Sequence, residues 1–115
     1  MSVTIYHNPR CSKSRATLAL LEERGVDIAI VKYLETPPSV EDLKGILFAL
    51  GLSPREVLRK DEAAYKELGL ADEAHSDDAL IEAMAANPIL IERPIVVRGG
   101  KAVIGRPPER VLDLI

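Results

Sequence analysis

Short apolar runs and one helical pattern alternate along the first third of the chain. Residues 3–6 and 28–33 are rich in β-branched and aromatic side chains, which favours β-strands. Residues 12–24, between them, predict a helix that stops at Gly25. Its inner side is expected to carry Ala16, Leu18, Leu20 and Leu21. A strand, a helix and a strand in this order form a βαβ unit, whose two strands run parallel.

The middle of the chain has helical periodicity. Serine residues open three predicted helices as N-caps, at Ser39, Ser53 and Ser76. The first of these helices ends at Gly51 and the last at Asn87. No strand-like run appears in this block, so it is predicted to be helical throughout.

Strand patterns return at the end of the chain. Residues 95–98 and 101–104 are joined by Gly99-Gly100, and two glycines between such runs predict a tight hairpin. Pro107-Pro108 opens a predicted last helix. The order is therefore βαβ, a helical block and ββα, with no linker or repeat. We expect residues 1–115 to form a single domain.

Composition and charge narrow the class of protein. A chain of 115 residues that is 47% hydrophobic fits one globular domain. We expect no membrane span and no export signal, hence a cytoplasmic protein. A net charge of −3 argues against general nucleic-acid binding. Acidic residues are absent before Glu22 and again between Arg93 and Arg106, so these two stretches would form a local anion site if they met.

The strongest candidate for chemistry is Cys11, the only cysteine. Lone cysteines are often buried and inert, but cations at Arg10, Lys13 and Arg15 flank this one at a predicted helix start. Free N–H groups of the first turn, including that of Ser14, favour an anion there. A single thiol cannot form an internal disulfide, so a catalytic Cys11 needs an external thiol.

Three further residues have two interpretations each. A protonated His7 would support the Cys11 thiolate, or His7 is a loop histidine that only hydrogen-bonds the backbone. Arg93 and Arg106 each adjoin a proline at the ends of the hairpin strands, where paired hydrogen bonds to an oxyanion are possible. Most arginines are solvated surface charges, so that interpretation also stays open.

Several separated motifs resemble one known family, the glutaredoxin-coupled arsenate reductases. They are His7-Asn8-Pro9-Arg10-Cys11, Leu58-Arg59-Lys60, Asn87-Pro88-Ile89-Leu90, Glu92-Arg93-Pro94-Ile95-Val96-Val97 and Gly105-Arg106-Pro107. The resemblance covers essentially the whole chain. It implies an α/β, thioredoxin-like fold with a four-stranded mixed sheet and a helical insertion at about residues 39–92. It also implies that Pro94 is a cis-proline beside the active cysteine.

The resemblance further implies roles for individual residues. Cys11 would be the nucleophile that attacks arsenate, with its thiolate stabilised by His7 and Ser14. The oxyanion-binding residues would be Arg59, Arg93 and Arg106. Glutathione would be a co-substrate and glutaredoxin the partner that completes the reduction. No bound cofactor, metal, nucleic acid or membrane is expected.

Two other functions stay open at this point. A glutathione-dependent thiol-disulfide oxidoreductase would need Cys11 but no oxyanion site. A non-enzymatic thioredoxin-like regulator could bind RNA polymerase, although Ser14 stands where a second cysteine would make a redox switch. A phosphatase-like reductase is disfavoured because the position that its Cys-x5-Arg loop needs for arginine is Thr17.

Overall fold

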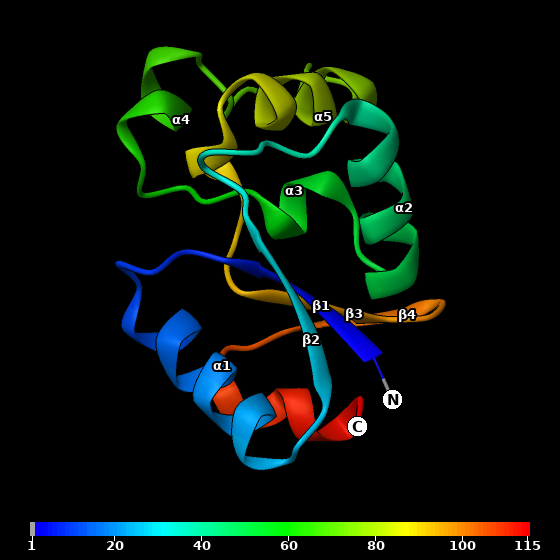
Figure 1. Cartoon of the computed structure of the whole chain (residues 1–115). Coiled ribbons are helices and arrows are strands. Elements are labelled where there is room, and N and C mark those ends of the chain that lie inside the picture. The colour runs from blue at the N-terminus through cyan, green and yellow to red at the C-terminus, as the bar shows by residue number, and fades with distance from the viewer. Residues whose placement is uncertain (1) are drawn as a thin grey trace. The chain divides into compact units, whose positions relative to one another are not determined.

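The chain divides into two compact units. The computed structural model describes residues 2–115. The sheet unit consists of the residues before Pro37 together with Arg93–Ile115, and the helical unit is Pro37–Glu92 (Figure 1). The sheet unit contains β1 (Ser2–His7), α1 (Ser12–Glu23), β2 (Asp27–Lys32), β3 (Ile95–Arg98), β4 (Lys101–Ile104) and η2 (Pro108–Asp113). The helical unit contains α2 (Val40–Leu50), α3 (Pro54–Val57), α4 (Ala63–Glu67), α5 (Asp77–Ala86) and η1 (Pro88–Leu90).

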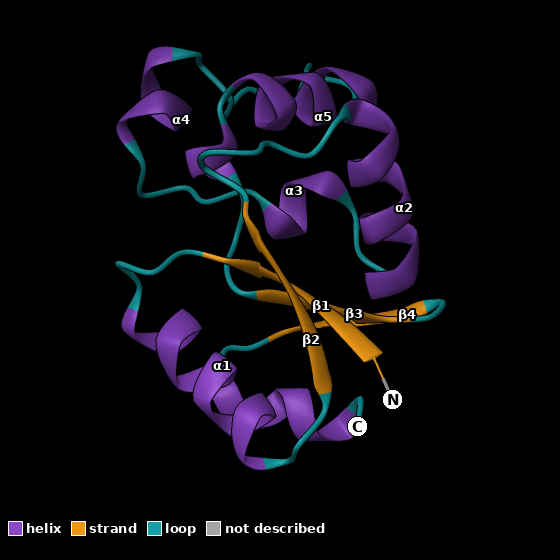
Figure 2. Ribbon diagram, in the orientation of Figure 1, coloured by secondary structure: helices purple, strands orange, loops and turns teal. Residues whose placement is uncertain are grey.

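The four strands form one mixed sheet in the order β2-β1-β3-β4 (Figure 2). β1 and β2 are parallel, whereas β3 is antiparallel to both β1 and β4. Ile5 of β1 pairs with Ile30 of β2 and with Val96 of β3. The predicted four-stranded mixed sheet is therefore confirmed. Because β1 and β2 are parallel, their carboxyl ends lie at the same edge, where α1 begins.

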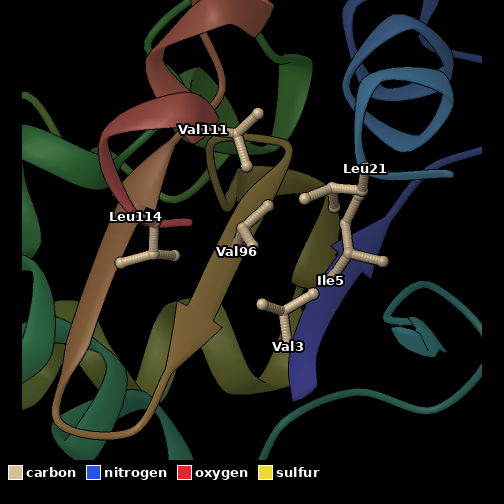
Figure 3. Close-up of a cluster of buried hydrophobic side chains, with 6 residues drawn as sticks. All are labelled: Val3, Ile5, Leu21, Val96, Val111 and Leu114. Carbon is tan, nitrogen blue, oxygen red and sulfur yellow. The ribbon is translucent and has the colours of Figure 1, made fainter. Parts of the chain in front are cut away.

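One face of the sheet packs against α1 and η2. The buried cluster on this face is Val3, Ile5, Leu21, Val96, Val111 and Leu114 (Figure 3). Burial in β1 alternates, so that Val3, Ile5 and His7 are the buried positions. Since alternate side chains of a strand share a face, His7 continues the line of Val3 and Ile5 toward the start of α1. Hydrophobic packing thus fixes the strand that presents His7.

The inner face of α1 differs from the predicted one. Its buried residues are Ser14, Thr17 and Leu21, whereas Ala16 is exposed. Leu18 and Leu20 are half-buried at the margin of the cluster. The spacing of the buried positions is that of a helix face, but two of the three are polar. Ser14 and Thr17 can be buried although they are polar, because each hydroxyl makes a hydrogen bond. A prediction from apolar spacing alone therefore misses them.

The helical unit begins with a capping box. Ser39 Oγ accepts from the N–H of Asp42, and Asp42 Oδ2 accepts from the N–H of Ser39. At the other end of the block, Ser76 Oγ caps α5 through the N–H of Ala79. Buried side chains of this unit include Leu43, Ile46, Leu47, Val57, Leu80, Ile81, Met84 and Leu90. Within residues 2–115, no helix has both the length and the apolar character needed to cross a lipid bilayer.

The last helix is a 3₁₀ helix, η2, rather than the predicted α-helix. Its hydrogen bonds span three residues, from the N–H of Arg110 to the carbonyl of Pro107 and from Leu114 to Val111, both at 3.0 Å. The segment is entered through two consecutive prolines, Pro107 and Pro108, which lack N–H groups. The predicted single-domain organisation of residues 1–115 stays a prediction.

Candidate active site

Cys11 is the N-cap residue of α1. Its N–H donates to the carbonyl of Asn8 at 3.0 Å, which closes a tight turn after β1. Its own carbonyl accepts the first helical bond from the N–H of Arg15, also at 3.0 Å. The Cys11 side chain is half-buried. The thiol therefore lies where the unpaired N–H groups of a helix start favour negative charge.

Several groups compete to set the pKa of the Cys11 thiol. Burial raises this pKa and is the largest single influence. Hydrogen bonds from the Ser14 N–H, the Arg93 side chain and the Lys13 N–H, together with the charge of Arg93, lower it by more. The net pKa of Cys11 is therefore below its ordinary value. Since the thiolate is the reactive form, the site favours the nucleophile.

Two arginines flank the sulfur from the hairpin. Arg93 lies two residues before β3 and Arg106 two residues after β4, and the pairing of Ile95 with Ile104 puts both at one end of the hairpin. Arg106 Nη1 lies 4.0 Å from Cys11 Sγ and donates to the carbonyl of Arg93 at 3.2 Å. The peptide bonds Arg93–Pro94 and Arg106–Pro107 are both cis. The sheet thus brings together the Cys11 sulfur and two guanidinium groups that are far from it in sequence.

His7 and Ser14 form a buried pair behind the sulfur. His7 Nδ1 lies 2.7 Å from Ser14 Oγ, and the same oxygen accepts from the N–H of Asn8 at 3.0 Å. Burial lowers the pKa of His7, and the charges of Lys32 and Arg15 lower it further. The fold therefore favours the neutral imidazole, not the protonated form considered from the sequence. Support for the thiolate from His7 has to pass through Ser14, whose N–H faces the sulfur.

A second buried contact behind the site involves Thr17 and Gly105, which the sequence analysis did not assign to it. Thr17 is fully buried and donates to the carbonyl of Lys13 at 2.8 Å. A Cβ built on Gly105 would lie 2.5 Å from Thr17 Oγ1 and 2.9 Å from Pro94 Cγ. Only glycine permits this close approach. In the sequence, the one indication of this close approach was Gly105 itself, directly before Arg106.

Arg59 belongs to the helical unit. Its guanidinium contacts three carboxylates: Glu92 at 2.9 Å, and Glu62 and Asp61 both at 3.3 Å. Its backbone N–H donates to the carbonyl of Leu90 at 2.7 Å. The Arg59 side chain is only 10% exposed, so it is a structural centre of this unit. Its expected role in binding the oxyanion stays a prediction.

The fold and the site in the sheet unit define a thioredoxin-like protein that carries a single cysteine at the start of its first helix and a cis-proline, Pro94, directly before β3. The sequence model of the ArsC family matches residues 6–114. The chain belongs to the ArsC family.

Comparison with individual proteins supports this assignment. The chain is 54% identical over 110 residues to an arsenate reductase of Neisseria meningitidis, covering 95% of this chain and 94% of that protein. It is 59% identical over 114 residues to the uncharacterized protein YfgD of Escherichia coli, covering 98% of this chain and 96% of YfgD. The solved structure of an arsenate reductase from Vibrio cholerae superposes with a TM-score of 0.98 at 59% identity, covering 100% of this chain and 98% of that one.

Proposed function

We propose that this protein reduces arsenate to arsenite, with Cys11 as the nucleophile and with glutathione and glutaredoxin as the source of electrons. The observation that carries the proposal is the 4.0 Å approach of the Arg106 guanidinium to Cys11 Sγ. Arg93 hydrogen-bonds the same sulfur, whose pKa is lowered. A thiolate between two guanidinium groups suits a tetrahedral oxyanion that must be both held and attacked.

The first half of the reaction forms the covalent bond. Arsenate binds with its oxygens on Arg93 and Arg106, which offsets the repulsion between the oxyanion and the thiolate. Cys11 Sγ then forms a bond to arsenic, and one arsenic-bound hydroxyl takes up a proton and leaves as water. The N–H groups of Lys13 and Ser14 hold the sulfur in its anionic form before attack. Arsenic is still pentavalent at this stage.

The second half supplies two electrons from outside the chain. Glutathione condenses with the arsenic and releases a second water. A glutaredoxin thiolate then attacks the glutathione sulfur, a disulfide forms, and the electron pair of the broken sulfur–arsenic bond stays on arsenic. Water displaces Cys11 from the trivalent arsenic, and arsenite leaves. In sum, arsenate and two thiols give arsenite, one disulfide and one water.

Further parts of the proposal follow from the sequence resemblance and, for the location, from the single cysteine. His7 and Ser14 keep the Cys11 loop in place and favour its thiolate. Arg59 is the third oxyanion-binding residue. No bound cofactor takes part, because the thiols carry the electrons. A reducing cytoplasm suits a protein that depends on its single free thiol.

A coupled assay tests the proposal. Purified protein with glutathione, glutaredoxin, glutathione reductase and NADPH should oxidise NADPH only when arsenate is added, and Cys11→Ser should abolish this. Arg93→Ala and Arg106→Ala should each lower kcat/KM for arsenate roughly 10- to 100-fold, from the loss of a charge-assisted bond worth about 1.5–3 kcal/mol. Arg110→Ala is the matched control, since Arg110 is exposed on η2.

Two results would overturn the proposal. One is arsenate turnover that survives Cys11→Ser. The other is rapid reduction of a small disulfide without any arsenate dependence, unaffected by Arg93→Ala, which would instead identify a general thiol-disulfide oxidoreductase.

A further inference from the structure

A cavity of about 340 Å³ lies at the carboxyl edge of β1 and β2. Its lining consists of His7, Asn8, Pro9, Arg10, Lys32, Leu34 and Glu35. His7 and Lys32 are neighbours in the parallel register of the two strands, so the cavity lies at the edge where both strands end. The oxyanion site uses the other side of β1, where Arg93 and Arg106 approach from the hairpin. Nothing in the proposed reaction yet uses this cavity.

The charges of the cavity suit a small zwitterion. Arg10 and Lys32 supply two cations, and Glu35 supplies one carboxylate. Lys32 and Glu35 are held together because the N–H of Glu35 donates to the carbonyl of Lys32 at 3.0 Å. Among residues 2–115, no acidic side chain lies within ion-pair distance of Arg10 or Lys32. The apolar side chains of Pro9 and Leu34 complete the lining.

The cavity is separated from the sulfur by a single turn. The hydrogen bond from the Cys11 N–H to the carbonyl of Asn8 closes a four-residue turn, and three of those residues line the cavity. The ends of such a turn lie within about 7 Å of each other. The thiol of glutathione is on its central residue, so it projects from the cavity when both ends of the tripeptide are seated there. Only the 8–11 turn then separates this thiol from the far side, where arsenic would be bonded to Cys11.

We infer that this cavity, formed by Arg10, Lys32 and Glu35, binds glutathione and directs its thiol around the 8–11 turn to the arsenic on Cys11. Glutathione has two carboxylates and one ammonium group, which matches the two cations and one carboxylate of the cavity. Lys32 and Arg10 bind the carboxylates, and Glu35 faces the ammonium group. This inference rests on the proposed function and adds the location of the second substrate.

Kinetics with separate substrates tests the inference. Lys32→Ala should raise KM for glutathione about three- to tenfold, the range expected for losing one partly exposed ionic contact, and should leave KM for arsenate within twofold. Lys32→Arg should restore most of the affinity, and Lys32→Glu should weaken it further. Lys101→Ala is the matched control, because Lys101 is exposed on β4 away from this cavity. Glutathione amidated at its glycine carboxylate should bind the wild type more weakly than glutathione does. Its affinity should also fall less than that of glutathione on Lys32→Ala.

A binding experiment separates this inference from the proposed function. S-methylglutathione cannot react, so its binding to the wild-type protein is measured by amide chemical shifts without arsenate. Shifts centred on residues 8–10 and 32–35, weakened in Lys32→Ala, would support the site even if arsenate turnover failed. Arsenate turnover with an unchanged KM for glutathione in Lys32→Ala, and shifts elsewhere, would overturn the site and leave the function standing. A change in KM for glutaredoxin alone would overturn it too.

Discussion

Gly105→Ala adds one methyl group to the most crowded contact behind the site. The new Cβ would lie 2.5 Å from Thr17 Oγ1, 2.9 Å from Pro94 Cγ and 3.1 Å from Thr17 Cγ2. Non-bonded carbon atoms prefer separations of about 3.5–4.0 Å, so all three contacts are repulsive. Thr17 is fully buried in α1, and the ring of Pro94 is rigid. The chain around Gly105 therefore has to move away from α1.

The expected loss of stability is that of an overpacked core. Such insertions cost about 1–3 kcal/mol of the free energy of unfolding, which urea denaturation measures directly. The loss of arsenate activity should exceed what the loss of stability alone would cause. Arg106 follows Gly105, and its Nη1 contacts Cys11. A displacement of about 1 Å at a reacting centre can cost roughly 100-fold in rate. We expect kcat/KM for arsenate in Gly105→Ala to approach that of Arg106→Ala.

A second substitution identifies the clash as the cause. Thr17→Ala removes both threonine atoms that crowd the new Cβ, so the double variant Thr17→Ala/Gly105→Ala should be more stable than the two single effects predict. Gly45→Ala is the control. Gly45 is exposed within α2 with no heavy atom within 4 Å of a built Cβ, and alanine there should raise stability by about 0.5–1 kcal/mol. An unfolding free energy and an arsenate activity of Gly105→Ala equal to those of the wild type would refute the reasoning. So would strict additivity in the double variant.

Three further predictions concern titration and ion pairs. Alkylation of Cys11 by iodoacetamide should follow an apparent pKa below the ordinary value of about 8.5, and Arg93→Ala should raise it; an unchanged midpoint would contradict the assigned role of Arg93. Burial lowers the pKa of His7, so the folded protein binds fewer protons than the unfolded chain between the two pKa values. The stabilisation is complete above about pH 6.5 and is lost as the pH falls through the folded pKa. Urea unfolding at pH 8 and pH 5.5 should therefore show that the free energy of unfolding falls more on acidification for the wild type than for His7→Asn. Equal falls would count against a neutral buried imidazole. Arg59→Lys should lower the free energy of unfolding by about 1–3 kcal/mol, because a lysine cannot contact all three carboxylates at once; a loss below about 0.5 kcal/mol would show that the network is energetically idle.

Local signals in the sequence predicted most of the elements. The Gly99-Gly100 turn fixed the hairpin, Ser39 and Ser76 fixed two helix starts, and the run before Cys11 put the thiol at a helix N-terminus. Each of these features depends on residues a few positions apart. The parallel βαβ pair and the hairpin followed from these local patterns, whereas their union in one four-stranded mixed sheet was implied by the family resemblance.

Features that join distant residues needed the tertiary structure. Sequence spacing put Leu21 of α1 inside correctly, but it missed Ser14 and Thr17, which share the buried face. It offered a protonated His7, whereas burial and neighbouring cations favour the neutral ring.

By itself, the sequence determined which residue can be the nucleophile, since Cys11 is the only thiol and its neighbours are basic. Only the folded sheet decided that Arg106, late in the chain, lies 4.0 Å from that sulfur and that Gly105 must be a glycine to let it approach. The physical reason is that backbone propensities and caps act over one or two turns. The pairing of β1 with β3 and of β3 with β4 is a long-range event that sets contacts to within an ångström.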